Sequence, residues 1–300
     1  MLRFKKEAQL KEKKLDGFYP TQKLGTGASG EVYLHKTEDK TYAVKMMSDV
    51  DWDDTTEFYN DLIWQTIIYN QINTLQKSIK VHGYDIYEGD DGVKYVCFIM
   101  DYIENYCDCW DYLSDSEMWS RYVVTPFNKR DNQKNTIYYI LNREDKLKYI
   151  KSLISSVEEI HELNIVHGDI KLSNLLIHKS GDVKLIDFGA SIFVENDRKY
   201  METDWTHGTL GYRAPEEDNN NLLGLSSDIY SIGVTIIEIW CGNIWYSGDN
   251  FKECRNEVLK ALRKVEKEEP EIGKILRKCV DMDGKKRPTI QKLKGFFNNF

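Results

Sequence analysis

The sequence has 300 residues, of which 41% are hydrophobic, so it is long enough to bury a sizeable core in one large domain or two lobes. Its formal net charge of −8 at pH 7 argues against nucleic-acid or membrane binding through bulk positive charge. No apolar run approaches the length of a membrane span, and the charged first residues do not resemble a signal peptide. We therefore expect a soluble, cytoplasmic protein with no nucleic-acid or membrane partner.

Residues 1–17 form a locally basic extension, rich in Lys and Glu, with a few leucines among the charges. This pattern predicts a surface helix or a frayed tail with a solvated face. Electrostatic docking to a partner is the alternative.

A glycine-rich segment follows, Leu24-Gly25-Thr26-Gly27-Ala28-Ser29-Gly30-Glu31-Val32, between two β-like runs. Its three glycines let backbone amides approach phosphate oxygens without a Cβ in the way. Strand residues continue through Val32 and Leu34 and no helical pattern follows, which argues against a Rossmann turn. The next expected strand, Thr41-Tyr42-Ala43-Val44-Lys45, carries one lysine that could hold phosphates, although a strand lysine more often faces solvent.

Residues 58–72 carry apolar side chains at helical spacing, at positions 58, 62, 69 and 72. Residues 81–88 and 93–102 then predict a β-hairpin, with its turn at Glu88-Gly89-Asp90-Asp91-Gly92. The second strand of this hairpin runs into Met100, for which a place in the core is the simplest interpretation.

The most informative stretch is His167-Gly168-Asp169-Ile170-Lys171-Leu172-Ser173-Asn174, followed by Asp187-Phe188-Gly189. Residues 174–177 and 182–186 predict two short strands joined by a turn, so the polar groups before the first strand and after the second should meet at one end. Two carboxylates, an ammonium and an amide suit phosphoryl transfer: one carboxylate positions a hydroxyl, while the other and the amide hold Mg²⁺. The alternative is an ordinary hairpin with a charged rim.

The remaining sequence predicts a mainly helical region. Residues 147–163 form a 3.6-residue apolar stripe, which predicts a buried helix leading into the stretch at 167. The polar segment 190–213 is long enough to lie across a substrate cleft, and it closes with Gly208-Thr209-Leu210-Gly211-Tyr212-Arg213-Ala214-Pro215-Glu216. Residues 228–240 predict an almost wholly apolar, central helix, and Arg287-Pro288-Thr289 opens the last one.

Seven motifs in this order resemble those of eukaryotic-type protein kinases, from about Phe18 to about residue 295. They are G-x-G-x-x-G-x-V, A-V-K, H-x-D-x-K-x-x-N, D-F-G, A-P-E, D-x-x-S-x-G and a late R-P-T. The resemblance implies an α+β fold with a small antiparallel β-sheet lobe at 18–102 and a larger, mainly helical lobe at 103–300. Residues 116–142 would be an insertion, for which we expect local packing, with partner contact as the alternative.

The resemblance also implies a role for each catalytic group, with ATP and Mg²⁺ as the nucleotide and the metal. Lys45 would hold the phosphates, Asp169 would position the attacking hydroxyl, and Lys171 would contact the γ-phosphate. Asn174 and Asp187 would bind the metal ions. The nucleotide would be lined by the glycine loop and hinge, namely Leu24, Gly25, Thr26, Gly27, Ala28, Ser29, Gly30, Val32, Ala43, Lys45, Met100, Asp101, Ile103 and Leu176. Met100 would be the gatekeeper, and the backbone of Asp101 and Ile103 would pair with adenine.

Further residues would support the site, again by resemblance. His167 would pack against Phe188, and Thr209 would hydrogen-bond the catalytic aspartate, as serine/threonine kinases arrange it. Asp228 would cap its helix or brace the catalytic loop. Arg287 would form a buried pair with Glu216. In the central helix, Glu238 would favour basic residues near the phosphorylation site.

Two positions depart from the family pattern. The family pairs its strand lysine with a helix glutamate, but the best-matching position here is Gln65, with Glu57 as the alternative. The second departure is Gly168, which stands where the family usually has an arginine that holds a phosphorylated residue. This glycine predicts activity that does not require that phosphate, although Ser191, Tyr200, Thr203 and Thr206 offer hydroxyls in the segment.

These features predict a serine/threonine protein kinase that acts as a monomer on protein substrates. A pseudokinase or scaffold of the same fold is the first alternative, which the two departures favour and the retained catalytic groups oppose. A small-molecule kinase is the second alternative, and the intact Gly208-to-Glu216 segment opposes it.

Overall fold

The computed structural model describes residues 10–27, 30–47, 55–90, 92–104, 106–108, 127–130, 137–178, 180–195, 198–203, 208–242, 244 and 248–300. Most of the predicted insertion at 116–142 lies outside these residues, as do Ala28, Ser29 and Thr206. The chain divides into two compact units, Met1–Glu104 and Asn105–Phe300. Among the described residues, no helix is long and apolar enough to cross a membrane.

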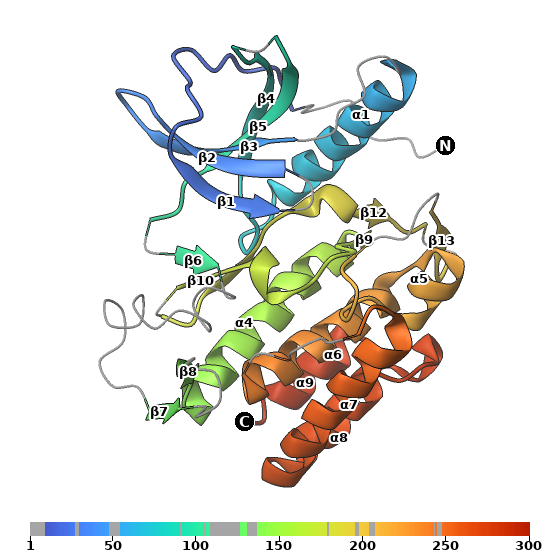
Figure 1. The fold of residues 1–300 in the computed structure, drawn as a ribbon. Coiled ribbons are helices and arrows are strands. Elements are labelled where there is room, and N and C mark those ends of the chain that lie inside the picture. The colour runs from blue at the N-terminus through green and yellow to red at the C-terminus, as the bar shows by residue number, and fades with distance from the viewer. Residues whose placement is uncertain are drawn as a thin grey trace. The chain divides into compact units, whose positions relative to one another are not determined.

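The first unit contains a five-stranded antiparallel sheet in the order β1-β2-β3-β5-β4 (Figure 1). Its strands are β1 Lys23–Gly27, β2 Gly30–Lys36, β3 Thr41–Met46, β4 Val81–Glu88 and β5 Lys94–Asp101. The single helix of the described part of this unit, α1 Thr55–Ile72, lies along the sheet (Figure 1). Tyr69 of α1 is 1% exposed, and its ring lies 4.8 Å from that of Phe98 on β5.

The opposite sheet face is covered by the chain that precedes β1. Because side chains alternate along a strand, Val44 and Cys97 point away from Phe98 and pack with Leu15 and Phe18. The Leu15 N–H donates to Asp85 Oδ2 at 2.7 Å, and Glu12 forms a parallel bridge with Tyr84. Residues 10–17 therefore form neither the predicted surface helix nor a frayed tail, because both of their leucines are buried and Leu15 packs on β3 and β5.

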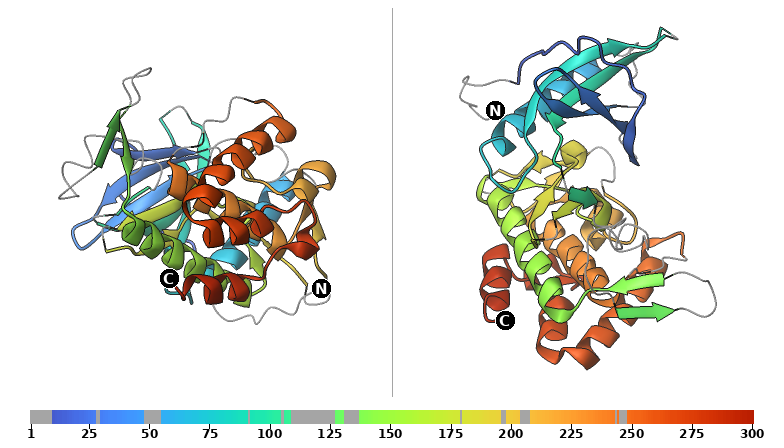
Figure 2. Two further views of the ribbon diagram at one scale, coloured as in Figure 1. Left: turned by 90° about the horizontal axis from the view of Figure 1, so that it is seen from below. Right: turned by 90° about the vertical axis from the view of Figure 1, so that its left-hand side faces the viewer.

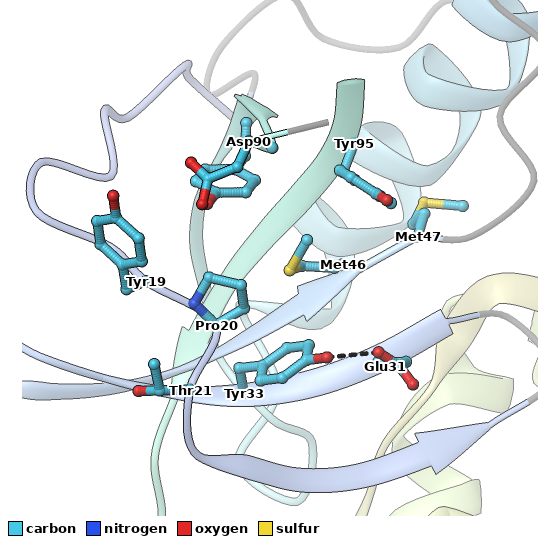
Figure 3. Close-up of a pocket in the computed structure, with 11 residues that line it drawn as sticks. Tyr19, Pro20, Thr21, Glu31, Tyr33, Met46, Met47, Asp90 and Tyr95 are labelled. Carbon is cyan, nitrogen blue, oxygen red and sulfur yellow. Dashed lines mark hydrogen bonds between the residues drawn. The ribbon is translucent and has the colours of Figure 1, made fainter. Parts of the chain in front are cut away.

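A cavity of about 480 Å³ opens on this covered side of the first unit (Figure 3). Tyr19 and Pro20 form one wall, and Tyr33 and Tyr95 project from the sheet, with the Tyr33 hydroxyl donating to Glu31 at 2.5 Å (Figure 3). None of its lining residues belongs to the predicted nucleotide-binding set.

The second unit is mainly helical (Figures 1 and 2). Its helices are α4 Arg143–Glu162, α5 Pro215–Asn220, α6 Leu225–Cys241, α7 Phe251–Glu268, α8 Pro270–Cys279 and α9 Ile290–Phe297. Three short 3₁₀ turns accompany them, η1 Leu172–Asn174, η2 Phe188–Ala190 and η3 Gly284–Lys286. Its strands are β6 Tyr106–Asp108, β7 Phe127–Arg130, β8 Ile137–Ile140, β9 Ile165–Val166, β10 Leu175–His178, β11 Val183–Leu185, β12 Ile192–Phe193, β13 Met201–Glu202 and β14 Leu222–Leu223.

Helix α6 is the centre of the second unit, as its apolar sequence predicts. Every residue from Ser227 to Trp240 is buried, and α6 packs against α4, α7 and α8. Helix α4 presents its predicted apolar stripe to this core and also packs along α9 and β11 (Figures 1 and 2). A sheet-based unit and a helical unit in sequence confirm the predicted α+β fold class.

Candidate active site

The hairpin of β10 and β11 brings the predicted catalytic groups of the second unit to one end. Leu175 pairs with Leu185 and Ile177 with Val183, in the predicted antiparallel register. Asn174 directly precedes β10, and Asp187 follows β11 with only Ile186 between them. The Ile186 N–H donates to the Asn174 carbonyl at 3.1 Å and closes this end of the hairpin.

Both carboxylate oxygens of Asp169 are held by neighbours. Oδ1 accepts from the Thr209 hydroxyl at 2.8 Å, and Oδ2 accepts from Lys171 Nζ at 2.8 Å and from Asn174 Nδ2 at 2.9 Å. Lys171 Nζ also donates to Thr209 Oγ1 at 2.6 Å, so the hydroxyl links the ammonium to the carboxylate. Charge-assisted bonds of this kind are the strongest that side chains make, and here they fix the orientation of one carboxylate.

Asp228, in the first turn of α6, braces the backbone of residues 167–174, here called the catalytic loop. This carboxylate is 1% exposed. Its Oδ2 accepts from the His167 N–H at 2.8 Å, and its Oδ1 accepts from the Gly168 N–H at 3.0 Å. His161 Nε2 also lies 2.9 Å from Oδ2. A buried carboxylate requires such partners, because an unpaired charge in the interior is costly. Of the two predicted possibilities, the structure shows the bracing contact.

His167 and Phe188 lie together, with ring centroids 4.8 Å apart. His167 Nε2 lies 3.0 Å from the Ile186 carbonyl, and Ser191 Oγ donates to the His167 carbonyl at 2.9 Å. Asp187 has φ +60° and ψ +74° in the left-handed region, which a non-glycine residue rarely adopts. Such backbone conformations occur mainly where surrounding contacts impose them, often at functional sites.

Gly168 has φ +79°, and a Cβ there would lie 2.6 Å from the Ala190 carbonyl and 3.2 Å from Leu223 Cδ2. The backbone conformation and the surrounding atoms both favour glycine at this position. The loop is therefore closely packed on this side, and Leu223 occupies the space next to it.

Arg287 and Glu216 form a bidentate ion pair, with Nη1–Oε1 at 2.7 Å and Nη2–Oε2 at 2.8 Å. The Arg287 side chain is fully buried, and its Nη1 also donates to the Ser226 carbonyl at 2.8 Å. Ser227 Oγ donates to Glu216 Oε1 at 2.8 Å. These bonds satisfy the buried charges and attach the end of the Gly208-to-Glu216 segment to the helical core.

In the first unit, the glycine segment contributes β1 and the first residues of β2. Gly27 pairs with Gly30, and Val32 pairs with Lys45 on β3. Gly30 has φ +134°, and a Cβ there would overlap the Met46 carbonyl, so both conformation and packing require glycine. Gly25 differs, because a Cβ there would meet no atom of the described residues within 4 Å, and its φ is not positive. Neither packing among the described residues nor backbone conformation therefore requires glycine at position 25.

The predicted contact between Gln65 and Lys45 is absent, which corrects our expectation. Both side chains are buried, at 9% and 4% exposure, so Gln65 does face the interior one turn before Tyr69. Its Oε1 atom, however, accepts no hydrogen bond from any residue that the structure describes. The helical spacing correctly predicted that Gln65 is buried. Burial alone did not determine whether its Oε1 would accept a hydrogen bond from Lys45. Glu57 lies in α1, and its side chain is outside the described set.

Of the predicted hinge residues, Met100 and Asp101 end β5 and Ile103 follows it. Met100 is 7% exposed and pairs with Ala43 on β3. The Asp101 N–H donates to the Lys80 carbonyl at 2.9 Å, and Asp101 pairs with Tyr42 on β3. Burial would raise the pKa of the Asp101 carboxyl, but hydrogen bonds with Lys40 and His82 outweigh it and lower that pKa. Ile103 is partly buried, and Leu24 on β1 is exposed.

Glu238 does not have the exposure that a substrate-reading acid needs. It is 0% exposed, and it accepts from the Tyr212 hydroxyl at 2.5 Å and the Ile244 N–H at 3.2 Å. Burial raises its pKa to about 7, and these hydrogen bonds offset only part of that effect. Glu238 therefore supports the Tyr212 loop in this structure, and the predicted preference for basic residues finds no basis in it.

Sequence reasoning missed several supporting groups. His161 lies on the apolar stripe of α4 and contacts Asp228, and a histidine on such a stripe is the only signal that could have identified it. Glu217 follows the A-P-E motif and is 2% exposed, with Oε1 unpartnered among the described residues. Burial raises the pKa of its carboxyl to about 9, and the Ala214 N–H offsets this only in part.

Comparisons with known proteins agree with this geometry. The family model described as "Protein kinase domain" matches residues 18–295. A "Probable myosin light chain kinase" of Dictyostelium discoideum is 27% identical over 286 residues, which cover 92% of this chain and 52% of that protein. A "Probable LRR receptor-like serine/threonine-protein kinase" of Arabidopsis thaliana is 30% identical over 81% of this chain and 21% of its own length. The "Probable serine/threonine-protein kinase MARK-C" of Dictyostelium discoideum is 35% identical over 52% of this chain and 20% of its own length. The chain thus spans about half or less of these relatives.

Proposed function

Since the chain belongs to the protein kinase family, we propose that it transfers the γ-phosphate of ATP to serine and threonine hydroxyls of protein substrates. The observation that carries this proposal is the fixed carboxylate of Asp169, bound by Lys171, Asn174 and Thr209. A carboxylate held at this position can accept the proton of an attacking hydroxyl and orient the hydroxyl for transfer. The two relatives described above whose printed names include serine/threonine-protein kinase support the choice of hydroxyl.

The other groups of this cluster have complementary roles in the proposal. Lys171 places a positive charge beside Asp169, where charge on a transferred phosphoryl group would otherwise repel the carboxylate. Thr209 holds the ammonium and the carboxylate at fixed separation, and it connects them to the segment that would bind a protein substrate. Lys45, on the buried side of β3, would hold the nucleotide phosphates.

The residues present fit Mg²⁺, with Asn174 and Asp187 holding it. Among the described residues, no group of three or more His, Cys, Asp or Glu could hold a metal ion by itself. Mg²⁺ does not need such a group, because it retains waters and binds one or two protein oxygens together with substrate phosphates. Asn174 Nδ2 is committed to Asp169, so its amide oxygen is the atom left for the metal. When bound, Mg²⁺ would neutralise charge on the phosphates.

We also propose that activity does not depend on phosphorylation of the polar segment 190–213, here called the activation segment. Gly168 has no side chain that could bind a phosphate. Of the predicted phosphorylation sites, Ser191 is 2% exposed and bonded to His167, and Thr203 Oγ1 donates to the Asn221 carbonyl at 3.0 Å. These hydroxyls already have structural partners, which supports a segment held in place without phosphate.

The experiment is a radiolabelled ATP assay on mixed protein substrates, with Asp169→Asn and Asp187→Ala as test variants. We expect both variants to lose at least about two orders of magnitude in turnover, and Asp187→Ala also to lose Mg²⁺-dependent ATP binding. Asp39→Asn, in an exposed turn, is the matched control and should retain full activity. Labelled phosphoserine or phosphothreonine supports the proposal. Near-normal phosphorylation by Asp169→Asn would refute the mechanism, and nucleotide binding without any transfer would indicate a pseudokinase.

A further inference from the structure

The segment that follows the Asp187-Phe188-Gly189 motif is tied to the second unit by a small antiparallel pairing. Met201 pairs with Leu223 and Glu202 with Leu222, so β13 lies on β14. The Thr203 N–H extends the pairing by donating to the Asn221 carbonyl at 2.9 Å. This contact holds residues 201–203 through backbone atoms and does not depend on any charged side chain.

Next to this pairing, Met201 packs on a small apolar cluster formed by Val166, Val194 and Leu223. Val166 directly precedes the catalytic loop, and Leu223 lies 3.2 Å from the position of a Cβ on Gly168. The place where relatives carry a phosphate-binding arginine is therefore bordered by an apolar contact between the activation segment and the catalytic loop. This apolar contact can couple the activation segment to the catalytic loop, which an arginine–phosphate pair cannot do here because residue 168 is a glycine.

Tyr200, immediately before β13, occupies a slot between two glycines. A Cβ on Gly224 would lie 2.8 Å from Tyr200 Cδ1, and a Cβ on Gly284 would overlap the Tyr200 hydroxyl. Neither glycine has a positive φ, so backbone conformation does not require glycine at either position. The close approach of Tyr200 and its neighbour Lys199 is what excludes a side chain there. Ser226, two residues after Gly224 in the sequence, donates from Oγ to the Tyr200 hydroxyl at 3.0 Å.

The slot also adjoins the buried ion pair that anchors the other end of the segment. Arg287 Nη1 bonds both Glu216 and the Ser226 carbonyl, and the Arg287 N–H donates to the Gly284 carbonyl at 3.3 Å. Residues 198–203 and the Gly208-to-Glu216 segment are thus attached to one support. A shift of Tyr200 would disturb the support that also holds Glu216.

From these contacts we propose that Tyr200 is a positioning residue that holds the activation segment in its working conformation, in place of a phosphate. The proposal rests on the proposed function for its effect on catalysis. Tyr200 does not touch the reacting atoms. It acts through the β13–β14 pairing and the Ser226–Arg287 support, so its loss should affect protein-substrate binding more than ATP binding.

The test uses the full chain and compares Gly284→Ala, Tyr200→Phe and the double variant. In Gly284→Ala the new methyl group would overlap the Tyr200 hydroxyl and displace the Tyr200 side chain. In the double variant that oxygen is absent, and the nearest atoms to the methyl group become Ser226 Oγ at 3.0 Å and Arg287 Nη1 at 3.5 Å. Gly295→Ala, where no atom of the described residues lies within 4 Å, is the matched control.

Two readouts are measured, namely amide hydrogen exchange of residues 198–203 and kinetics with a protein substrate. We expect Gly284→Ala to speed exchange about tenfold or more and to raise KM for the protein substrate about tenfold, with KM for ATP unchanged. Tyr200→Phe, which loses one hydrogen bond, should change both readouts less than about fivefold. The double variant should return close to Tyr200→Phe, and Gly295→Ala should match the wild type.

Exchange in Gly284→Ala that equals the wild type, or a double variant no better than Gly284→Ala, would overturn the role of Tyr200. A wild-type chain without phosphotransfer would refute the proposed function instead, and the exchange readout would still decide whether Tyr200 holds the segment.

Discussion

The amide of Gln65 is a buried polar group whose oxygen has no hydrogen-bond partner among the described residues. Leaving a buried carbonyl unpaired costs about 1–3 kcal/mol, so the native contacts of α1 must compensate for it. Apolar packing supplies that compensation, since Ile68, Tyr69 and Ile72 are each at most 1% exposed. Helix α1 is therefore held against the sheet by packing at this position, with no contribution from a Gln65–Lys45 bond.

The first prediction tests this interpretation with Gln65→Met, which keeps the length of the side chain and removes the unpaired oxygen. We expect kinase activity within about threefold of the wild type and an unfolding midpoint that is equal or higher, because a desolvation cost disappears. Lys45→Met is the comparison and should lose about two orders of magnitude in activity. An equally steep loss in Gln65→Met would show that Gln65 is the functional partner of Lys45.

The second prediction concerns the buried carboxyl of Glu217, whose pKa rises from 4.5 to about 9 on burial. Because the folded state holds this proton more tightly, the stability that the protonated form contributes is complete below pH 4.5 and declines as pH rises towards 9. Gln mimics the protonated form. Glu217→Gln should therefore match the wild type near pH 4.5 and exceed its free energy of unfolding by an amount on the order of 5 kcal/mol at pH 8.

Denaturant unfolding across this pH range measures the difference. Glu268→Gln, at an exposed glutamate of α7, is the control and should track the wild type at every pH. A constant offset between Glu217→Gln and the wild type from pH 5 to 8 would mean that Glu217 is already ionised in the folded protein.

At the scale of elements, the second unit places one rigid helix beneath the catalytic loop. Asp228 lies in the first turn of α6 and accepts from the N–H groups of His167 and Gly168, while His161 reaches the same carboxylate from α4. Two helices and a loop thus share a single buried acid. The loop geometry that orients Asp169 depends on where the core holds α6.

The third prediction follows from that dependence. Asp228→Asn keeps the shape of the side chain, but one of its two polar atoms becomes a donor, so it cannot accept from the N–H groups of both His167 and Gly168. We expect the free energy of unfolding to fall by about 3 kcal/mol and kcat to fall about tenfold, with KM for ATP unchanged. Thermal unfolding and steady-state kinetics measure both effects. Asp249→Asn, at an exposed position before α7, serves as the control, and an Asp228→Asn variant with normal kcat would rule out the bracing role.

The same elements show what could be predicted from the sequence. The β10–β11 hairpin could be predicted because alternating apolar residues and a turn are local signals, and the positions of Asn174 and Asp187 follow from strand pairing alone. The slot for Tyr200 could not, because Gly224 and Gly284 are far apart in the chain and have ordinary backbone angles. Local patterns likewise gave no sign that residues 10–17 would cover the sheet, since their leucines are isolated among charges.

At the scale of the whole molecule, the two units have different tasks in the proposed function. The first offers the glycine-rich segment and a buried lysine, and the second offers the fixed carboxylate of Asp169 and the anchored activation segment. In a phosphorylation-switched kinase, a phosphate would tie that segment to the loop through an arginine. Here Gly168 and Leu223 stand at that place, and β13, β14 and Tyr200 hold the segment instead.

The last prediction is that the chain is constitutively competent. Protein treated with phosphatase until mass spectrometry detects no phosphate should keep at least about half of its activity, because the contacts that hold residues 198–203 involve no phosphate. Thr206 lies outside the described residues, so Thr206→Ala is assayed alongside and should behave like the treated protein. Thr203 is left unchanged, since its hydroxyl donates to Asn221 and its removal would weaken the segment for a different reason. Activity that disappears on treatment and returns on rephosphorylation would show that a basic residue other than one at position 168 reads a phosphate in this segment.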